Sequence, residues 1–169
     1  IYPLSFYYDF GATWLAPCQY DEPDAIADFY AILLKEANAE KDKDESLKKW
    51  KAAQKFNAQV RIFVPILVRD FEGEGVKWWG FSPKTYRELN DLCDNLDYEN
   101  YYDVKTGRDI TLTYTPKEKT ATGFAHFAIL PKPKETPVST DKDVLEMVKN
   151  MPKLEEFFTK PTFEETKTA

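Results

Sequence analysis

Hydrophobic and polar residues alternate with a period of two along five segments, the pattern of strands with one buried face. The clearest of these segments is V-R-I-F-V-P-I-L-V-R at 60–69. Branched apolar residues occupy one face of it, whereas the other face begins with Arg61 and Phe63. The predicted strands cover 2–10, 59–69, 76–81, 109–115 and 123–130, and the last is ended by Pro131 and Pro133.

Apolar residues at helical spacing predict helices between and after these strands. A long insertion at about 14–58 holds a helix from Asp24 to about Ala37 and a lysine-rich helix near 46–56. Ser82 followed by Pro83 is typical of a helix start. Thr140 is the predicted cap of a further helix in the C-terminal part of the chain.

The order strand, insertion, strand, strand, helix, strand, strand is that of an OB-fold barrel. We therefore expect a mainly β protein with α: a five-stranded OB-fold domain over 1–135 and a helical extension packed on it over 136–169. In this fold, strands two and three and the loops between strands one and two and strands four and five bind oligonucleotides or oligosaccharides.

Composition and charge refine this picture. The chain has 169 residues, enough for one domain, and its 12 Phe, 10 Tyr and 4 Trp exceed what a small core needs, which favours surface rings for recognition. The net charge of -6 counts against nucleic acid. However, a local basic cluster is formed by Lys48, Lys49, Lys51, Lys55 and Arg61.

The cysteines and the first residues of the chain indicate its cellular compartment and its origin from a longer protein. Cys18 and Cys93 are too few for a disulfide framework and suit a reducing compartment. No apolar run of membrane length and no signal peptide is visible. The chain begins at Ile1 in strand-like sequence, so we expect a core excised from a longer protein.

The predicted binding surface combines cations with rings, because cations meet phosphates and rings stack on bases. Two interpretations remain for the segment around Trp50: a surface that follows the phosphates, or a solvated helix face that Trp50 anchors. Trp14 is either a stacking ring or a cover for the end of the barrel. Register decides whether Trp78 or Trp79 faces the ligand. The candidate residues are Trp14, Lys48, Lys49, Trp50, Lys51, Lys55, Arg61, Phe63, Arg69, Trp79, Phe127 and Lys132. Val60, Ile62 and Val64 should point into the barrel.

The sequence contains few of the patterns that are typical of catalytic or metal-binding sites. His126 is the single histidine and lies in the middle of a predicted strand, and no CxxC pair, P-loop or GxGxxG occurs. Asp91, Asp94 and Asp97 follow helical spacing, which a solvated helix face explains better than a metal cluster. We expect no enzyme, no cofactor and no metal site.

Several motifs resemble the single-stranded DNA-binding, helix-destabilising protein family of T-even-like phages. They are P-I-L-V-R-D at 65–70, V-K-W-W-G-F at 76–81 with Y-R-E-L at 86–89, D-V-K-T-G-R-D-I-T-L at 103–112 and P-T-F-E-E at 161–165. The resemblance implies an OB-fold core that binds and protects single strands in phage replication, recombination and repair, within the cytoplasm of an infected bacterium.

The resemblance also implies features that this chain lacks. Members of the family typically carry a basic N-terminal segment for cooperative binding and an acidic C-terminal tail for replication and recombination proteins. They hold zinc with one His and three Cys between the first two strands, where this chain has only Cys18 and no His. We therefore expect no zinc, with the helix from Asp24 stabilising this region instead.

Two functions follow as hypotheses. The first is sequence-tolerant binding of single-stranded DNA, with steep salt dependence. The second is an OB-fold module for carbohydrate or protein, because tryptophan and tyrosine also stack on sugars and the net charge is negative. The paired arginines around Phe63 favour DNA, since a neutral sugar offers them no partner. A metal-dependent nuclease is a third and more distant alternative.

Overall fold

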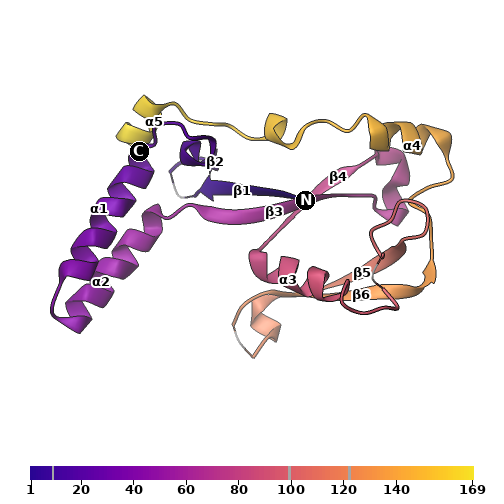
Figure 1. Ribbon diagram of the computed structural model, residues 1–169, viewed down its shortest axis with the longest axis horizontal. Helices are drawn as coiled ribbons and strands as arrows, with labels where there is room; N and C mark the ends of the chain where they lie inside the picture. The colour runs from indigo at the N-terminus through magenta and orange to yellow at the C-terminus, as the bar shows by residue number, and fades with distance from the viewer. Residues whose placement is uncertain (9, 99, 122) are drawn as a thin grey trace. The chain divides into compact units, whose positions relative to one another are not determined.

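The computed structural model describes residues 1–8, 10–98, 100–121 and 123–169 (Figure 1). The chain is mixed α/β with antiparallel sheets, and more of it is helical than extended, so the prediction of a mainly β protein is wrong. Two compact units are present: the first joins 1–61 to 152–169, and the second is 62–151. This grouping differs from the predicted domain and extension, because the C-terminal residues pack with the N-terminal ones.

The first unit contains a short antiparallel strand pair. Strand β1 (Tyr2–Tyr7) pairs with β2 (Trp14–Leu15), so that Phe6 lies opposite Leu15. The predicted strand extended to Phe10, but β1 ends at Tyr7, and Gly11 adopts a φ of 77° that turns the chain.

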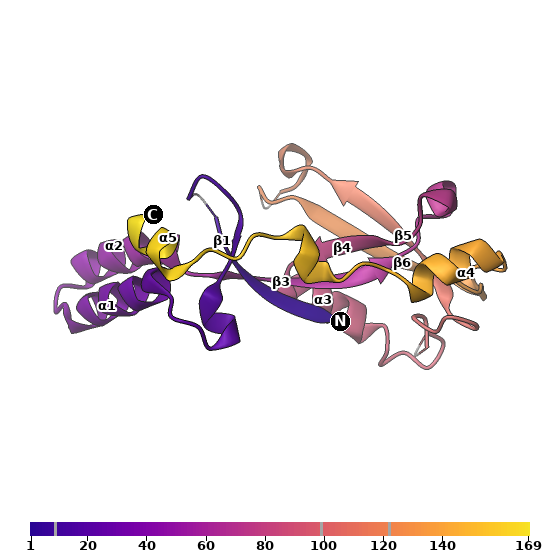
Figure 2. The same ribbon diagram turned by 90° about the horizontal axis from the view of Figure 1, so that it is seen from above.

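Two helices of the insertion lie side by side in both views (Figures 1 and 2). They are α1 (Ala25–Ala39) and α2 (Lys43–Ala53), preceded by η1 (Pro17–Tyr20) and followed by η2 (Gln54–Phe56). Ser46 donates to the carbonyl of Ala37 at 2.8 Å, and Gln54 donates to the Tyr30 hydroxyl at 3.2 Å. Both predicted helices are confirmed, although α2 starts earlier, where the Asp42 side chain caps it.

Asp24 connects α1 to the strand pair through a buried hydrogen-bond cluster. Its carboxylate is only 3% exposed and accepts from the backbone N–H groups of Ile26 and Ala27 as the helix cap. The other carboxylate oxygen accepts from the Tyr7 hydroxyl at 2.8 Å and the Cys18 N–H at 3.2 Å. Burial, followed by the bond to Asp24, raises the pKa of Tyr7 and that of the Cys18 thiol. The Asp24 carboxylate thus links the start of α1 to Tyr7 of β1 and to Cys18 of η1.

The C-terminal segment completes the first unit. It contains η5 (Leu154–Phe157) and α5 (Phe163–Thr168). The carbonyl of Thr159 accepts from the Leu15 N–H, and the Phe158 ring packs edge-on to Phe6 at 4.7 Å. Helix α5 lies beside the start of α1, where the Thr166 hydroxyl accepts from the Ala25 N–H (Figures 1 and 2).

The second unit begins at Ile62, within strand β3, and contains a strand pair and a helix. Strand β3 (Gln59–Ile66) leads through η3 (Arg69–Glu74) to β4 (Lys77–Phe81), and α3 (Pro83–Asp91) follows with Ser82 as its cap. The two strands pair antiparallel, with Ile62 opposite Phe81. Ile62 and Phe81 are buried with Leu89 of α3 and form the core of this unit.

A second antiparallel pair is formed by β5 (Arg108–Thr115) and β6 (His126–Glu135), with η4 (Lys117–Lys119) between them. The prediction that Pro131 and Pro133 end the last strand is wrong. A two-stranded sheet leaves one side of each strand without a ladder, so prolines fit there. Helix α4 (Lys142–Lys149) follows, and Asp141 caps it in place of the predicted Thr140.

Within the described residues, the strands do not close into a barrel, so only the coarser prediction of antiparallel sheets with helices is confirmed. None of the helices in this described part is long and apolar enough to cross a membrane.

Candidate nucleic-acid interface

Strand pairing determines which side chains share a face of β3–β4. Val64 lies opposite Trp79 and Ile62 opposite Phe81, so these four residues form the side that contains the core. On the other side Phe63 lies opposite Gly80 and Pro65 opposite Trp78. We call Phe63, Pro65 and Trp78 the aromatic face.

This register decides the orientation of Trp78 and Trp79, which the sequence left open, and corrects the predicted orientation of Val60. Trp79, not Trp78, packs against the core, and its ring centroid lies 4.5 Å from that of Phe81. Val60 was predicted to point into a barrel, yet it is 44% exposed. Ile62 and Val64 face the core as predicted, because the alternation along β3 is correct from Ile62 onward.

Gly80 leaves room for the Phe63 ring on the aromatic face. A Cβ atom added there would come within 2.5 Å of the Phe63 ring. The Phe63 ring therefore occupies the space over Gly80 where another residue would place a side chain. Phe63 and Trp78 are diagonal neighbours across the strand pair and both are partly exposed. Arg61 on the same side of β3 is exposed and forms no ion pair among the described residues.

The lysines of the first unit divide into paired and unpaired ones. Lys49 forms an ion pair with Glu40 at 2.6 Å, and the hydrogen bond to that carboxylate raises the pKa of Lys49. Lys48 pairs with Glu45 at 2.6 Å across one helical turn. Lys51 and Lys55 are exposed, and no ion pair involves either of them in the described part of the chain. Surface pairs such as Lys48–Glu45 contribute little and can exchange partners readily.

Helical spacing places Lys48, Lys51 and Lys55 on the solvent side of α2 and η2. Ser46 and Gln54 contact α1, whereas residues 48, 51 and 55 recur about one turn apart on the opposite side. No carboxylate occurs between Ser46 and Arg61. This row of cations is the most basic surface segment of the first unit.

The two tryptophans of the first unit differ in exposure. Trp50 lies in α2, between the two residues in the sequence that contact α1, and is 45% exposed. Trp14 packs parallel to Phe10, with ring centroids 6.3 Å apart, against the core cluster around Tyr7. Trp14 thus acts as a cover for the core.

Arg69 has a different role from the predicted one. It lies beyond β3, and its guanidinium donates to Asp109 through Nε and Nη2, to Glu72 through Nη1, and to the carbonyls of Pro137 and Val138. Arginine has five N–H donors, and these five bonds use all of them. The bond to Asp109 is the main cause that raises the pKa of Arg69. Arg69 therefore has no donor left for a phosphate.

The β5–β6 hairpin adds rings that the sequence pattern identified only in part. Phe127 lies opposite Tyr114, with ring centroids 5.1 Å apart, and 6.3 Å from the ring of Trp79. Tyr114 is 57% exposed and was missed, although alternation along β5 places it on the same face as Ile110. Lys132 is exposed and lies within β6, whereas the predicted strand ended before it.

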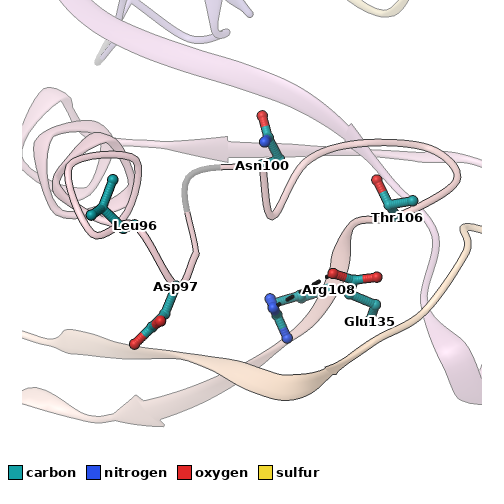
Figure 3. Close-up of a pocket in the computed structure, with 6 residues that line it drawn as sticks. All are labelled: Leu96, Asp97, Asn100, Thr106, Arg108 and Glu135. Atoms are coloured by element: carbon teal, nitrogen blue, oxygen red, sulfur yellow. Dashed lines mark ion pairs between the residues drawn. The ribbon is translucent and has the colours of Figure 1, made fainter.

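Figure 3 shows a polar hollow lined by Leu96, Asp97, Asn100, Thr106, Arg108 and Glu135. The Arg108 guanidinium donates to the Pro133 carbonyl and lies 5.4 Å from the centre of the Tyr98 ring. It also pairs with Glu135 at 3.8 Å. Arg108 is thus engaged by its own chain, and the hollow offers no free cation to an anionic ligand.

The twelve predicted residues divide between the two units. Those at 14–61 belong to the first, and Phe63, Arg69, Trp79, Phe127 and Lys132 belong to the second. Among the described residues, no group of three or more His, Cys, Asp or Glu side chains could hold a metal ion.

Comparison with known proteins adds no relative: no protein-family model, curated protein or solved structure matches this chain. The function must therefore be argued from the geometry of the two units.

Proposed function

We propose that this chain binds single-stranded DNA without strong sequence preference, as part of phage replication, recombination and repair. The observation that carries the proposal is the aromatic face, where the partly exposed Phe63 and Trp78 are diagonal neighbours across the strand pair; Arg61 is an exposed cation two residues earlier on the same strand. Bases of any identity stack on rings, and a neighbouring cation meets the phosphate. An OB-fold organisation of the second unit, as in T-even-like phage proteins, forms part of the proposal.

The lysine row of α2 and η2 supports this proposal independently. Lys48, Lys51 and Lys55 face solvent about one turn apart, which suits a flexible polyanion better than a neutral sugar. The net charge of -6 is compatible with this function because the cations are concentrated locally. Repulsion from the acidic remainder makes binding weaker at a given salt concentration.

Trp78 and Trp79 provide a matched pair of variants for the test. Trp78→Leu removes a ring from the aromatic face and should weaken oligo-dT binding by about 1–3 kcal/mol, the usual contribution of one stacked base. Trp79→Leu removes a ring that packs against the core, so it should lower the free energy of unfolding and change affinity less. Titrations of intrinsic tryptophan fluorescence and urea unfolding separate the two effects.

Salt dependence tests the electrostatic part. Each phosphate contact with a single strand contributes about 0.7 to the slope of log affinity against log salt. We expect Arg61→Gln to reduce the slope by about that amount. Binding that does not change between two salt concentrations would contradict the proposal and favour a neutral glycan or a protein partner.

A further inference from the structure

Arg69 joins three segments of the second unit that are distant in the sequence. Arg69 is the first residue of η3, which follows β3 after residues 67 and 68. It reaches Asp109 at the start of β5 with contacts of 2.6 and 2.9 Å. It also reaches the carbonyls of Pro137 and Val138, which follow the end of β6, at 2.9 and 2.7 Å. One guanidinium thus connects the end of β3 to both strands at the base of the β5–β6 hairpin.

The remainder of the hairpin is held mainly by apolar packing, since Ile110 of β5 and Ile129 of β6 lie against the core of Ile62, Phe81 and Leu89. At the base, the Thr136 N–H donates to the Gly107 carbonyl and the Val138 N–H donates to the Val104 carbonyl. Further along, the Phe127 ring touches Trp79 of β4. Beyond that point η4 and residues 123–126 are largely exposed, with Phe124 at 77%. The hairpin is thus held by apolar packing along its strands and by polar contacts at its base, where the guanidinium of Arg69 lies.

We infer that Arg69 is a positioning residue, which fixes the β5–β6 hairpin beside β3–β4 and does not touch DNA. Through this contact it sets where Phe127 and Lys132 lie relative to β3–β4. The part of this inference that concerns DNA rests on the proposed function, whereas the positioning of the hairpin does not. Asp109 has the same role from the other side of the ion pair.

Variants of opposite charge separate positioning from phosphate contact. Arg69→Gln removes a cation and Asp109→Asn removes an anion, so direct electrostatics predict opposite changes in affinity for oligo-dT. Positioning predicts weaker binding in both variants, because both release the hairpin. It also predicts an unchanged salt slope in Arg69→Gln, whereas Arg61→Gln, the matched control, lowers the slope by about 0.7. Arg69→Lys keeps the charge but loses the fork of donors, so it should behave as Arg69→Gln.

Amide hydrogen exchange tests the positioning without DNA. In the Arg69 and Asp109 variants, the amides of Thr136 and Val138 should exchange about tenfold faster or more, because their segment loses charge-assisted hydrogen bonds. The amide of Tyr86, bonded to the Ser82 carbonyl in α3, should keep its rate, which excludes global unfolding. In Arg61→Gln all three rates should stay the same.

The outcomes are distinct. Unchanged exchange at Thr136 and Val138 in Arg69→Gln, or a salt slope reduced as in Arg61→Gln, overturns the inference. Faster exchange in a protein that does not bind oligo-dT supports the positioning role of Arg69 and rejects the proposed function.

Discussion

Replacement of Asp24 by alanine should destabilise the first unit far more than replacement of Asp42. Both aspartates cap a helix by accepting from two backbone N–H groups. Asp42 is exposed, so in Asp42→Ala water can accept from the two N–H groups, and the free energy of unfolding falls by about 1 kcal/mol. Asp24 is 3% exposed and also accepts from the Tyr7 hydroxyl and the Cys18 N–H.

The additional cost comes from the donors that Asp24→Ala leaves without a partner. A buried donor without an acceptor costs about 1–3 kcal/mol. The Tyr7 side chain is 1% exposed, so water does not reach its hydroxyl readily. Together with the lost cap, we expect Asp24→Ala to lower the free energy of unfolding by about 3–5 kcal/mol.

Urea unfolding followed by far-UV circular dichroism measures both variants, since α1 and α2 contribute strongly to the signal. Tyr7→Phe in the wild type should cost about 1.5–3 kcal/mol, because it removes the hydrogen bond to the Asp24 carboxylate together with the 3.9 Å contact to Cys18 Sγ. In the Asp24→Ala background it should cost much less, because the buried hydroxyl then retains only its 3.9 Å contact with Cys18 Sγ. The reasoning is refuted if Asp24→Ala costs no more than Asp42→Ala, or if the Tyr7→Phe and Asp24→Ala effects simply add.

Three further predictions follow from the remaining contacts. Lys51→Gln should reduce the slope of log affinity for oligo-dT against log salt by about 0.7. Lys49→Gln should reduce this slope less, because Lys49 is paired with Glu40. Salt titrations that give the same slope for the two variants would contradict this prediction. Gly80→Ala should displace the Phe63 ring and weaken oligo-dT binding, with the circular dichroism spectrum unchanged as the control. Burial raises the pKa of Tyr101 from 10.0 to about 12, so its contribution to stability is present below pH 10 and is lost as the pH rises toward 12. Urea unfolding at several pH values should therefore show a smaller decline over this range in Tyr101→Phe than in the wild type.

Local chemistry made several elements predictable. The alternation at 59–69 identified β3, and Ser82 with Pro83 identified the start of α3. The lysine-rich segment was recognised as a helix, although the Asp42 cap moved its start. The sequence predicts a last strand that is too short, because proline interrupts the hydrogen-bond ladder of a central strand, whereas β6 belongs to a two-stranded sheet in which Pro131 and Pro133 fit.

The candidate site was less predictable because it depends on partners distant in the sequence. Arg69 was assigned to phosphate because it shares a predicted strand face with Arg61. In the structure the strand ends at Ile66, and Asp109, Pro137 and Val138 occupy its donors. No local sequence pattern predicts these hydrogen-bond partners. The exposed Tyr114 was missed for the same reason, since its contact with Phe127 requires the hairpin to be paired.

The sequence by itself determined the elements, the alternation of β3 and the basic segment around Trp50, because these depend on neighbours within a few residues. Only the tertiary structure decided that Trp78 shares the aromatic face with Phe63 while Trp79 packs against the core. The physical reason is that side chains alternate with a period of two along a strand, so one residue of register exchanges the two faces. Pairing between strands fixes that register.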